Sequence, residues 1–118
     1  MAKLNLSELG AIDGFIAAAI VDTDSGLALA TLGDGIDLEL AAAGNTEVVK
    51  AKRRVASALG LNDEIEDILI TLGKQYHLVR PLERNPNLFI YLVMDRKKSN
   101  LAMTRHTLKN FEQNLDFS

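Results

Sequence analysis

Seven consecutive apolar residues, Leu88 to Met94, constrain the fold more than any other segment of the sequence. In an extended strand, successive side chains point to opposite faces of the sheet. Both faces of this strand are then apolar, and a strand of that kind needs a packed layer on each side. The segment therefore predicts the central strand of a sheet that is covered on both faces.

The rest of the chain alternates between apolar segments and turn residues. Extended patterns predict four further strands, at residues 15–21, 27–32, 65–72 and 75–82. Helical spacing predicts three helices, at residues 4–12, 38–59 and 100–115. Asp37 and Ser99 stand where they can cap the second and third helices, and Gly60 can end the second.

These segments give the element order α-β-β-α-β-β-β-α. One hairpin and three further strands joined by short turns predict a mostly antiparallel sheet of five strands. Because the helices must pack on that sheet, the predicted fold class is an α+β sandwich. A chain of 118 residues is long enough to bury one core, so we expect a single domain over residues 1–118.

The predicted helix over residues 38–59 is more apolar than one core requires. At about 100° per residue, its polar side chains gather in one arc and its apolar arc spans roughly 200°. A helix that packs on a single core usually has an apolar stripe about 100° wide or slightly more. Asn45 and Lys52 divide the apolar arc into two stripes. The first stripe consists of Leu38, Ala42, Val49 and Ala56. The second stripe consists of Leu40, Gly44, Val48, Ala51, Val55 and Ala58.

Two apolar stripes need two covers. The chain's own sheet covers one, and we expect a second copy of the chain to cover the other, since homodimers are the commonest symmetric assembly. The small residues Gly44, Ala51 and Ala58 let a partner helix come close. The second stripe is therefore the predicted dimer interface. The alternative is that the N- or C-terminal helix covers it within one chain.

The segment IVDTDSGLAL, residues 20–29, places two carboxylates, Asp22 and Asp24, shortly before Gly26. An EF-hand calcium loop begins in a similar way, but it has glycine at its sixth position, glutamate at its twelfth and a helix on each side. Here glycine stands at the fifth position, Gly33 stands at the twelfth, and both flanks are apolar runs. The segment therefore predicts a hairpin turn, since Asp, Ser and Gly all favour turns.

Composition and motifs exclude several classes of function. The absence of cysteine excludes disulfides and thiolate metal sites and fits a cytoplasmic location. A net charge of −3 argues against nucleic acid as the main partner, and no apolar run approaches the roughly 20 residues that span a membrane. We expect His77 at a surface or edge, and neither it nor His106 belongs to a metal or catalytic motif. We therefore expect a protein that is not an enzyme, with no catalytic residue, cofactor or metal and no membrane insertion. The basic runs KRR at Lys52 and RKK at Arg96 are expected to be solvated.

Three segments together resemble the Roadblock family, also called the dynein light-chain Roadblock type. They are GFIAAAIVDTDSGLALA over residues 14–30, DLELAAA over 37–43 and NLAMTRHTL over 100–108. The resemblance extends from Leu4 to Leu115 in the same element order. It implies a homodimer whose long middle helices pair and whose sheet continues across the two subunits. It also implies partners: stand-alone prokaryotic members are regulators or scaffolds of small Ras-like GTPases, and eukaryotic relatives serve dynein and endosomal signalling complexes.

The function that the resemblance implies is a homodimeric regulator or scaffold that binds a small Ras-like GTPase and modulates its GTP hydrolysis. We expect the partner to contact the polar arc of the middle helix, formed by Glu39, Glu47, Lys50, Arg53 and Arg54. Two alternatives stay open. One is a general adaptor without a GTPase partner, and the other is a profilin-like or PAS-like sensor of a small ligand, which would need a pocket with convergent polar groups.

Overall fold

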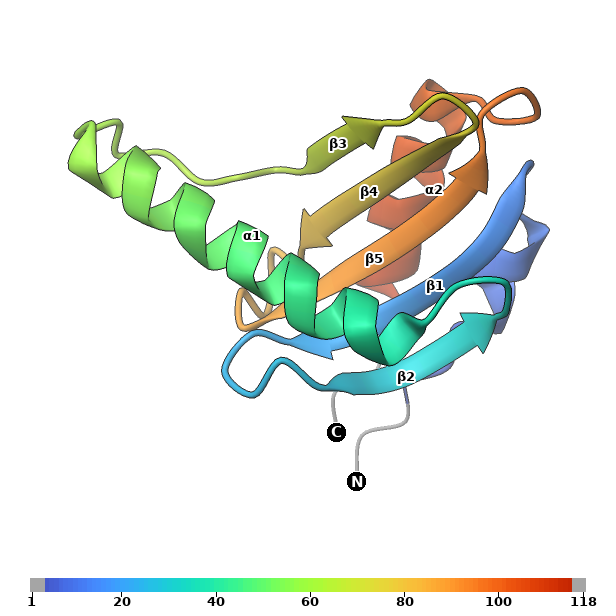
Figure 1. Cartoon of the computed structure of the whole chain (residues 1–118), viewed down its shortest axis with the longest axis horizontal. Helices are drawn as coiled ribbons and strands as arrows, with labels where there is room; N and C mark the ends of the chain where they lie inside the picture. Colours follow the sequence, from blue (N-terminus) through green and yellow to red (C-terminus); the bar gives the residue numbers. More distant parts are fainter. Residues whose placement is uncertain (1–3, 116–118) are drawn as a thin grey trace.

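A computed structural model describes residues 4–115 of the chain (Figure 1). Residues 1–3 and 116–118, which the expected domain includes, lie outside the described residues. Five strands form one antiparallel sheet in the order β2-β1-β5-β4-β3. They are β1 (Phe15–Asp22), β2 (Ala28–Gly33), β3 (Ile68–Thr71), β4 (Gln75–Pro81) and β5 (Leu88–Asp95). The predicted α+β fold class and the five-stranded sheet are confirmed.

The prediction of a central strand is confirmed by β5, which lies between β1 and β4. Every side chain from Leu88 to Met94 is buried. One row of these side chains joins a core beneath the C-terminal helix, and the other joins a core beneath the middle helix. The sheet is therefore covered on both faces, as the apolar character of both faces of this strand requires.

Two helices and one short 3-10 helix complete the fold: α1 (Leu38–Ala58), α2 (Leu101–Gln113) and η1 (Ser7–Ala11). Figure 1 shows α1 on one face of the sheet and α2 with η1 on the other. The α1 helix begins as predicted, because the backbone N–H of Leu40 donates to the Asp37 carboxylate at 3.0 Å. It ends as predicted too, since Gly60 follows with a φ of +67°.

Three expected elements differ in detail from the structure. The N-terminal helix is only a five-residue 3-10 turn, because Leu6 and Leu9 are three residues apart and one such turn buries both of them. The last helix is capped by Asn100, whose side chain accepts from the N–H of Met103. The prediction that Ser99 is the cap is wrong, because the Ser99 hydroxyl donates to the carbonyl of Asp95 instead.

The strand predicted over residues 65–72 is also shorter than expected, since β3 begins only at Ile68. The preceding Asp67 is held away from the ladder by Arg105 of α2, whose guanidinium donates two hydrogen bonds to its carboxylate at 2.9 and 3.1 Å. The chain between α1 and β3 is therefore a loop that reaches the sheet only at its last residues. Within residues 4–115, neither helix combines the length and apolar character needed to cross a membrane.

Candidate functional site

The second stripe of α1 faces solvent in the single chain. The side chains of Leu40, Val48 and Val55 are 71%, 37% and 50% exposed, and Gly44 and Ala58 are exposed as well, while Ala51 is half-buried. The first stripe faces the sheet, where Ala42 and Val49 are fully buried. The structure thus brings the six residues of the second stripe together on one outward surface of a single helix.

The alternative cover for the second stripe is excluded within residues 4–115. Both η1 and α2 pack against the core on the opposite face of the sheet, where Leu9, Leu108 and Phe111 are buried. Neither element can reach α1, because the sheet lies between them (Figure 1). The described part of the chain therefore leaves the second stripe without a cover.

The C-terminal half of α1 projects past the edge of the molecule (Figure 1). Its N-terminal half lies over β1 and β2, and the helix then leaves the sheet. Val55 in the last turns of the helix and Leu59 at its C-cap are exposed. On the same face, β3 and β4 present the half-buried side chains of Ile68, Ile70 and His77. One chain thus has an overhanging apolar helix and, beside it, a sheet surface without a helix above it.

The predicted polar arc is divided by the structure. Glu39, Glu47 and Arg54 are exposed, and Lys50 is half-buried. Arg53 turns toward the body of the protein, where its guanidinium donates to the carbonyl of Pro86 at 2.9 Å. Four of the five predicted partner-contact residues therefore remain free of such a bond, while Arg53 already joins α1 to the turn between β4 and β5.

A polar network between α1 and the sheet was not predicted. The Tyr91 hydroxyl hydrogen-bonds to Nδ1 of His77 at 2.9 Å, and Nε2 of that histidine hydrogen-bonds to Gln75 at 2.8 Å. The side-chain amide of Asn45 on α1 donates to the Ala41 carbonyl at 2.9 Å and also acts on the tyrosine. Burial lowers the pKa of His77, and burial raises the pKa of Tyr91 against an opposing effect of Asn45. The sequence signal was Asn45 itself, a single amide inside an apolar arc.

His77 lies on β4, which is flanked by β5 and β3, so it is not at an edge of the sheet. Its half-buried side chain lies on the sheet surface that has no helix above it, in line with the surface position that was the other expectation. His106 is exposed on α2 and lies 3.2 Å from the side-chain amide of Asn110. Among residues 4–115, His, Asp and Glu side chains nowhere gather in threes that could hold a metal ion.

The Asp22 carboxylate of the first hairpin accepts hydrogen bonds from its own turn. The Asp22 carboxylate accepts from the N–H of Asp24 at 3.2 Å and from the Ser25 hydroxyl at 2.8 Å, while its carbonyl accepts from the N–H of Gly26 at 2.7 Å. The predicted hairpin between β1 and β2 is confirmed. Asp22 acts as a turn former, since it satisfies backbone and hydroxyl donors within four residues.

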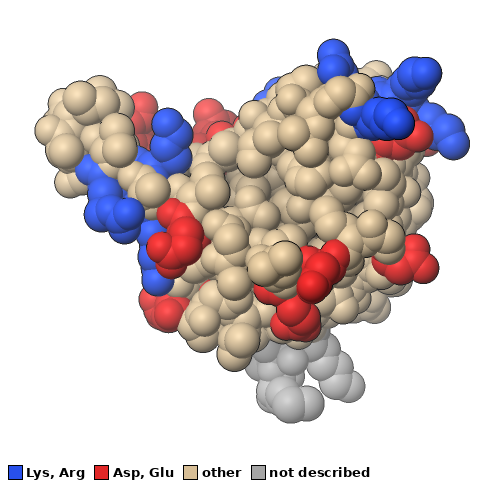
Figure 2. Space-filling model, in the orientation of Figure 1, with Lys and Arg blue, Asp and Glu red and all other residues tan. Residues whose placement is uncertain are grey.

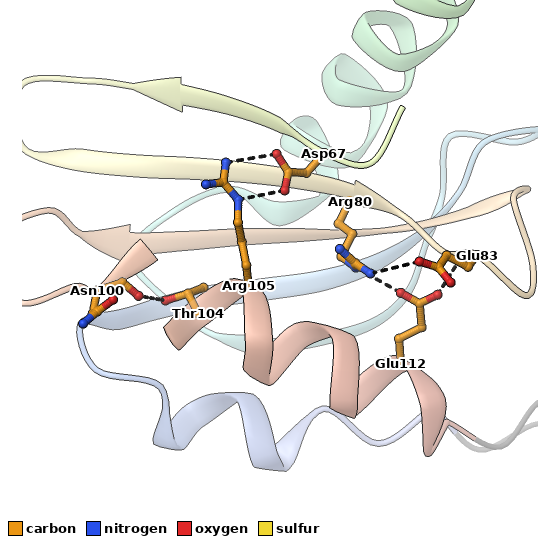
Figure 3. Close-up of polar contacts among 7 residues, drawn as sticks. All are labelled: Asp67, Arg80, Glu83, Asn100, Thr104, Arg105 and Glu112. Carbon is orange, nitrogen blue, oxygen red and sulfur yellow. Dashed lines mark hydrogen bonds and ion pairs between the residues drawn. The ribbon is translucent and has the colours of Figure 1, made fainter. Parts of the chain in front are cut away.

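Two ion pairs attach α2 to the sheet and its loops (Figure 3). Arg80 of β4 donates to Glu112 at 3.0 Å, and both side chains are more than nine-tenths buried. The second oxygen of the Glu112 carboxylate accepts from the backbone N–H of Glu83. The other pair joins Arg105 and Asp67, and it raises the pKa of the arginine through the hydrogen bonds to that carboxylate.

A cleft of about 1050 Å³ opens beneath the projecting half of α1. Its walls are the end of α1, the loop that leads to β3 and the turn between β4 and β5. Arg53 and Arg80 line it together with four carboxylates, those of Asp63, Glu64, Glu66 and Glu83. Of these groups, Arg80 is already paired with the buried Glu112 and Arg53 is bonded to Pro86, so both arginines of the cleft are engaged within the fold.

Comparison with solved structures finds close three-dimensional likeness at low sequence identity. The Roadblock/LC7 domain from Streptomyces avermitilis is 15% identical and matches with a TM-score of 0.79, over 91% of this chain and 88% of that one. Myxococcus xanthus MglB is 17% identical, with a TM-score of 0.73 over 84% of this chain and 78% of that one. The gliding protein MglB from Thermus thermophilus is also 17% identical, with a TM-score of 0.71 over 92% of this chain and 85% of that one. No protein-family model and no curated protein matches the chain.

Proposed function

Because this chain has the Roadblock/LC7 fold, we propose that it forms a homodimer through α1 and that the dimer binds a small Ras-like GTPase without being an enzyme itself. The observation that carries the proposal is the exposed second stripe of α1. Its exposed side chains include Leu40, Val48 and Val55, and within residues 4–115 the chain offers no cover for them. Transfer of one Leu or Val side chain from water to a packed interface contributes about 1.5–3 kcal/mol when burial is complete.

The shape of the single chain supports a two-fold arrangement. Each copy has an apolar helix end without a sheet beneath it and a sheet surface, at β3 and β4, without a helix above it (Figure 1). In an isologous dimer the same patch serves both partners, so each overhanging helix end lies on the open sheet surface of the other copy. This arrangement brings the two α1 helices together and covers Ile68, Ile70 and His77.

A GTPase partner is proposed on two grounds. The sequence segments that resemble the Roadblock family imply a partner of the Ras-like class, and the structure supplies a charged strip beside the second stripe, formed by the exposed Glu39, Glu47 and Arg54. Two such strips meet across the axis of the proposed dimer. A partner that sits on the axis is held by both subunits at once, so we expect two copies of this chain for each GTPase.

The test has two stages, and each is read out separately. Light scattering on the purified protein at micromolar concentration is expected to give the mass of a dimer, and a stable monomer would contradict the proposed interface. Titration with the Ras-like GTPases of the same organism, in GTP-analogue and GDP forms, is expected to give one complex with two chains per GTPase. A dimer that binds none of these GTPases would leave the general adaptor as its function.

Charge reversal locates the GTPase on the dimer. Arg54→Glu is expected to weaken binding and its salt dependence, because exposed charges at an interface mainly set encounter rate and specificity. Lys109→Glu, an equal charge change on exposed α2, is the matched control and should bind as the wild type does. Arg53 is a poorer choice for reversal, since its loss also removes the bond to Pro86. Equal affinity in all three proteins would place the GTPase elsewhere.

A further inference from the structure

A compact basic surface lies at the end of the sheet opposite the projecting helix. The turn between β3 and β4 and the turn between β5 and α2 meet there, because the N–H of Arg96 donates to the carbonyl of Lys74 at 3.0 Å. Figure 2 shows Lys and Arg gathered at this corner of the molecule, at the upper right. We define the basic end as Leu72, Lys74, Tyr76, Arg96, Lys97 and Lys98.

Hydrogen bonds hold the backbone of the turn after β5 in the basic end. The Asp95 carboxylate accepts from the N–H of Lys97 at 2.9 Å, and the Asp95 carbonyl accepts from the N–H of Lys98 at 3.2 Å. The N–H of Asp95 in turn donates to the carbonyl of Gly14 at 2.7 Å. These bonds fix the turn that carries the lysines, so the charges are presented from a defined backbone with little ordering left to be done on binding.

Arg96 of the basic end packs against Tyr76. The guanidinium lies 5.5 Å from the centre of the tyrosine ring and donates to the carbonyl of Leu72 at 3.1 Å. The Leu72 side chain is 43% exposed and lies on the opposite face of the β3–β4 hairpin, because Leu72 pairs with Gln75 whereas Tyr76 pairs with Thr71. Arginine and tyrosine are enriched at the energetic centres of protein interfaces. The basic end thus combines exposed lysines in two neighbouring turns with an exposed leucine on one face of the hairpin and an arginine against a tyrosine ring on the other.

The lysine charges of this surface are not used within the fold. Across residues 4–115, the ion pairs join Arg80 to Glu83 and Glu112, and Arg105 to Asp67. None of them involves Lys74, Lys97 or Lys98, which are all exposed. A chain with a net charge of −3 therefore concentrates unpaired positive charge at one corner.

We propose that the basic end docks an acidic segment of a protein partner, with glutamate or aspartate on the lysines and an apolar side chain against Leu72. A membrane surface fits the same charges less well. The surface is only two turns wide, acidic side chains border it in Figure 2, and the net negative charge of the chain opposes approach to an anionic bilayer. This site is separate from α1, and its test involves no GTPase.

The probe is a short fluorescein-labelled peptide in which glutamates flank two leucines. Its binding is measured by fluorescence anisotropy at low ionic strength. We expect the full chain to bind it and to release it as salt rises, since exposed charge pairs are screened within about 10 Å at 0.1 M salt. Lys97→Gln with Lys98→Gln is expected to weaken binding about five- to tenfold. The double variant Lys52→Gln with Lys109→Gln makes the same charge change on exposed residues elsewhere and should bind as the wild type does.

A second pair of variants tests the exposed leucine. Leu72→Ser is expected to weaken binding, and Met103→Ser, which alters an exposed apolar side chain on α2, should not. The proposal is overturned if the two lysine double variants bind equally, if the glutamine version of the peptide binds as well as the glutamate one, or if the glutamate peptide is not bound. The last experiment measures binding to vesicles of phosphatidylserine and phosphatidylcholine. If the protein binds these vesicles as tightly as it binds the peptide, the proposal is overturned in favour of a membrane site.

Discussion

The hydroxyl oxygen of Tyr91 on β5 lies 2.9 Å from Nδ1 of His77 on β4. The other ring nitrogen of this histidine lies 2.8 Å from Oε1 of Gln75, which can only accept. The proton of the neutral imidazole therefore sits on Nε2, and Nδ1 accepts from the tyrosine hydroxyl. Burial of the ring disfavours a second proton and so lowers the pKa of His77.

This geometry predicts that acid destabilises the fold through His77. A histidine whose pKa is lower in the folded chain than its ordinary value of about 6.5 takes up its proton more readily when the chain unfolds. The free energy of unfolding then falls as pH drops below about 6.5, and above that value the contribution is fully present. Urea unfolding of the wild type and of His77→Gln, at neutral pH and at about pH 5.5, measures this change in the free energy of unfolding.

We expect His77→Gln to lose part of the difference between the two pH values. His106→Gln replaces the exposed histidine of α2 and is the matched control. The assignment to His77 would be contradicted if both variants changed the pH dependence equally, or if His77→Gln kept the full dependence of the wild type.

The proposed dimer predicts that Val48→Glu and Val55→Glu give monomers. Both valines are exposed in the single chain, so the variants should keep the helix content and melting behaviour of an isolated subunit. In a dry interface an unpaired charge is strongly unfavourable, and the dimer should therefore dissociate. Sedimentation velocity across a concentration series measures this, with Met103→Glu as the control for an exposed apolar residue on the other face. Dimers of unchanged affinity in both valine variants would count against α1 as the interface.

The buried pair of Arg80 and Glu112 predicts a large stability loss from a small change (Figure 3). Glu112→Gln leaves the buried guanidinium without its charged partner, and breaking such a pair costs about 3–5 kcal/mol. Glu83→Gln is the control, because Glu83 is exposed and 3.8 Å from the same arginine, and exposed pairs contribute about 1 kcal/mol or less. Urea unfolding measures both, and similar losses would show that burial does not distinguish the two carboxylates.

The first hairpin predicts that calcium has no effect on stability. The Asp22 carboxylate already accepts from Asp24 and Ser25 within the turn, so it is engaged in holding the hairpin. Thermal unfolding of the wild type with and without millimolar calcium should give the same Tm. Asp22→Asn with Asp24→Asn should lower the Tm only slightly, since asparagine at position 22 can still accept through its amide oxygen and Asp24 is exposed. A calcium-dependent rise in the Tm of the wild type that the double variant lacks would assign a metal site to the turn.

The sequence determined the features that depend on neighbouring residues. Seven apolar residues from Leu88 to Met94 require cover on two faces wherever the strand lies, and β5 is the central strand. Asp37 caps α1 because its carboxylate reaches an N–H three residues away. The two stripes of α1 also follow from helical geometry alone, and the structure turns the first to the sheet and the second to solvent.

Only the tertiary structure decided what each surface meets. The polar arc placed Arg53 with the exposed charges, yet its guanidinium donates to the Pro86 carbonyl. Thr46 of the same helix is buried, and its hydroxyl donates to the Ala42 carbonyl at 2.7 Å. His77 and Tyr91 are fourteen residues apart in sequence and meet because β4 and β5 pair. Helical and strand periods give the direction of each side chain relative to its own element, whereas the order and stacking of the elements depend on contacts between distant segments. That is why the exposure of the second stripe became visible only once η1 and α2 were placed on the far side of the sheet.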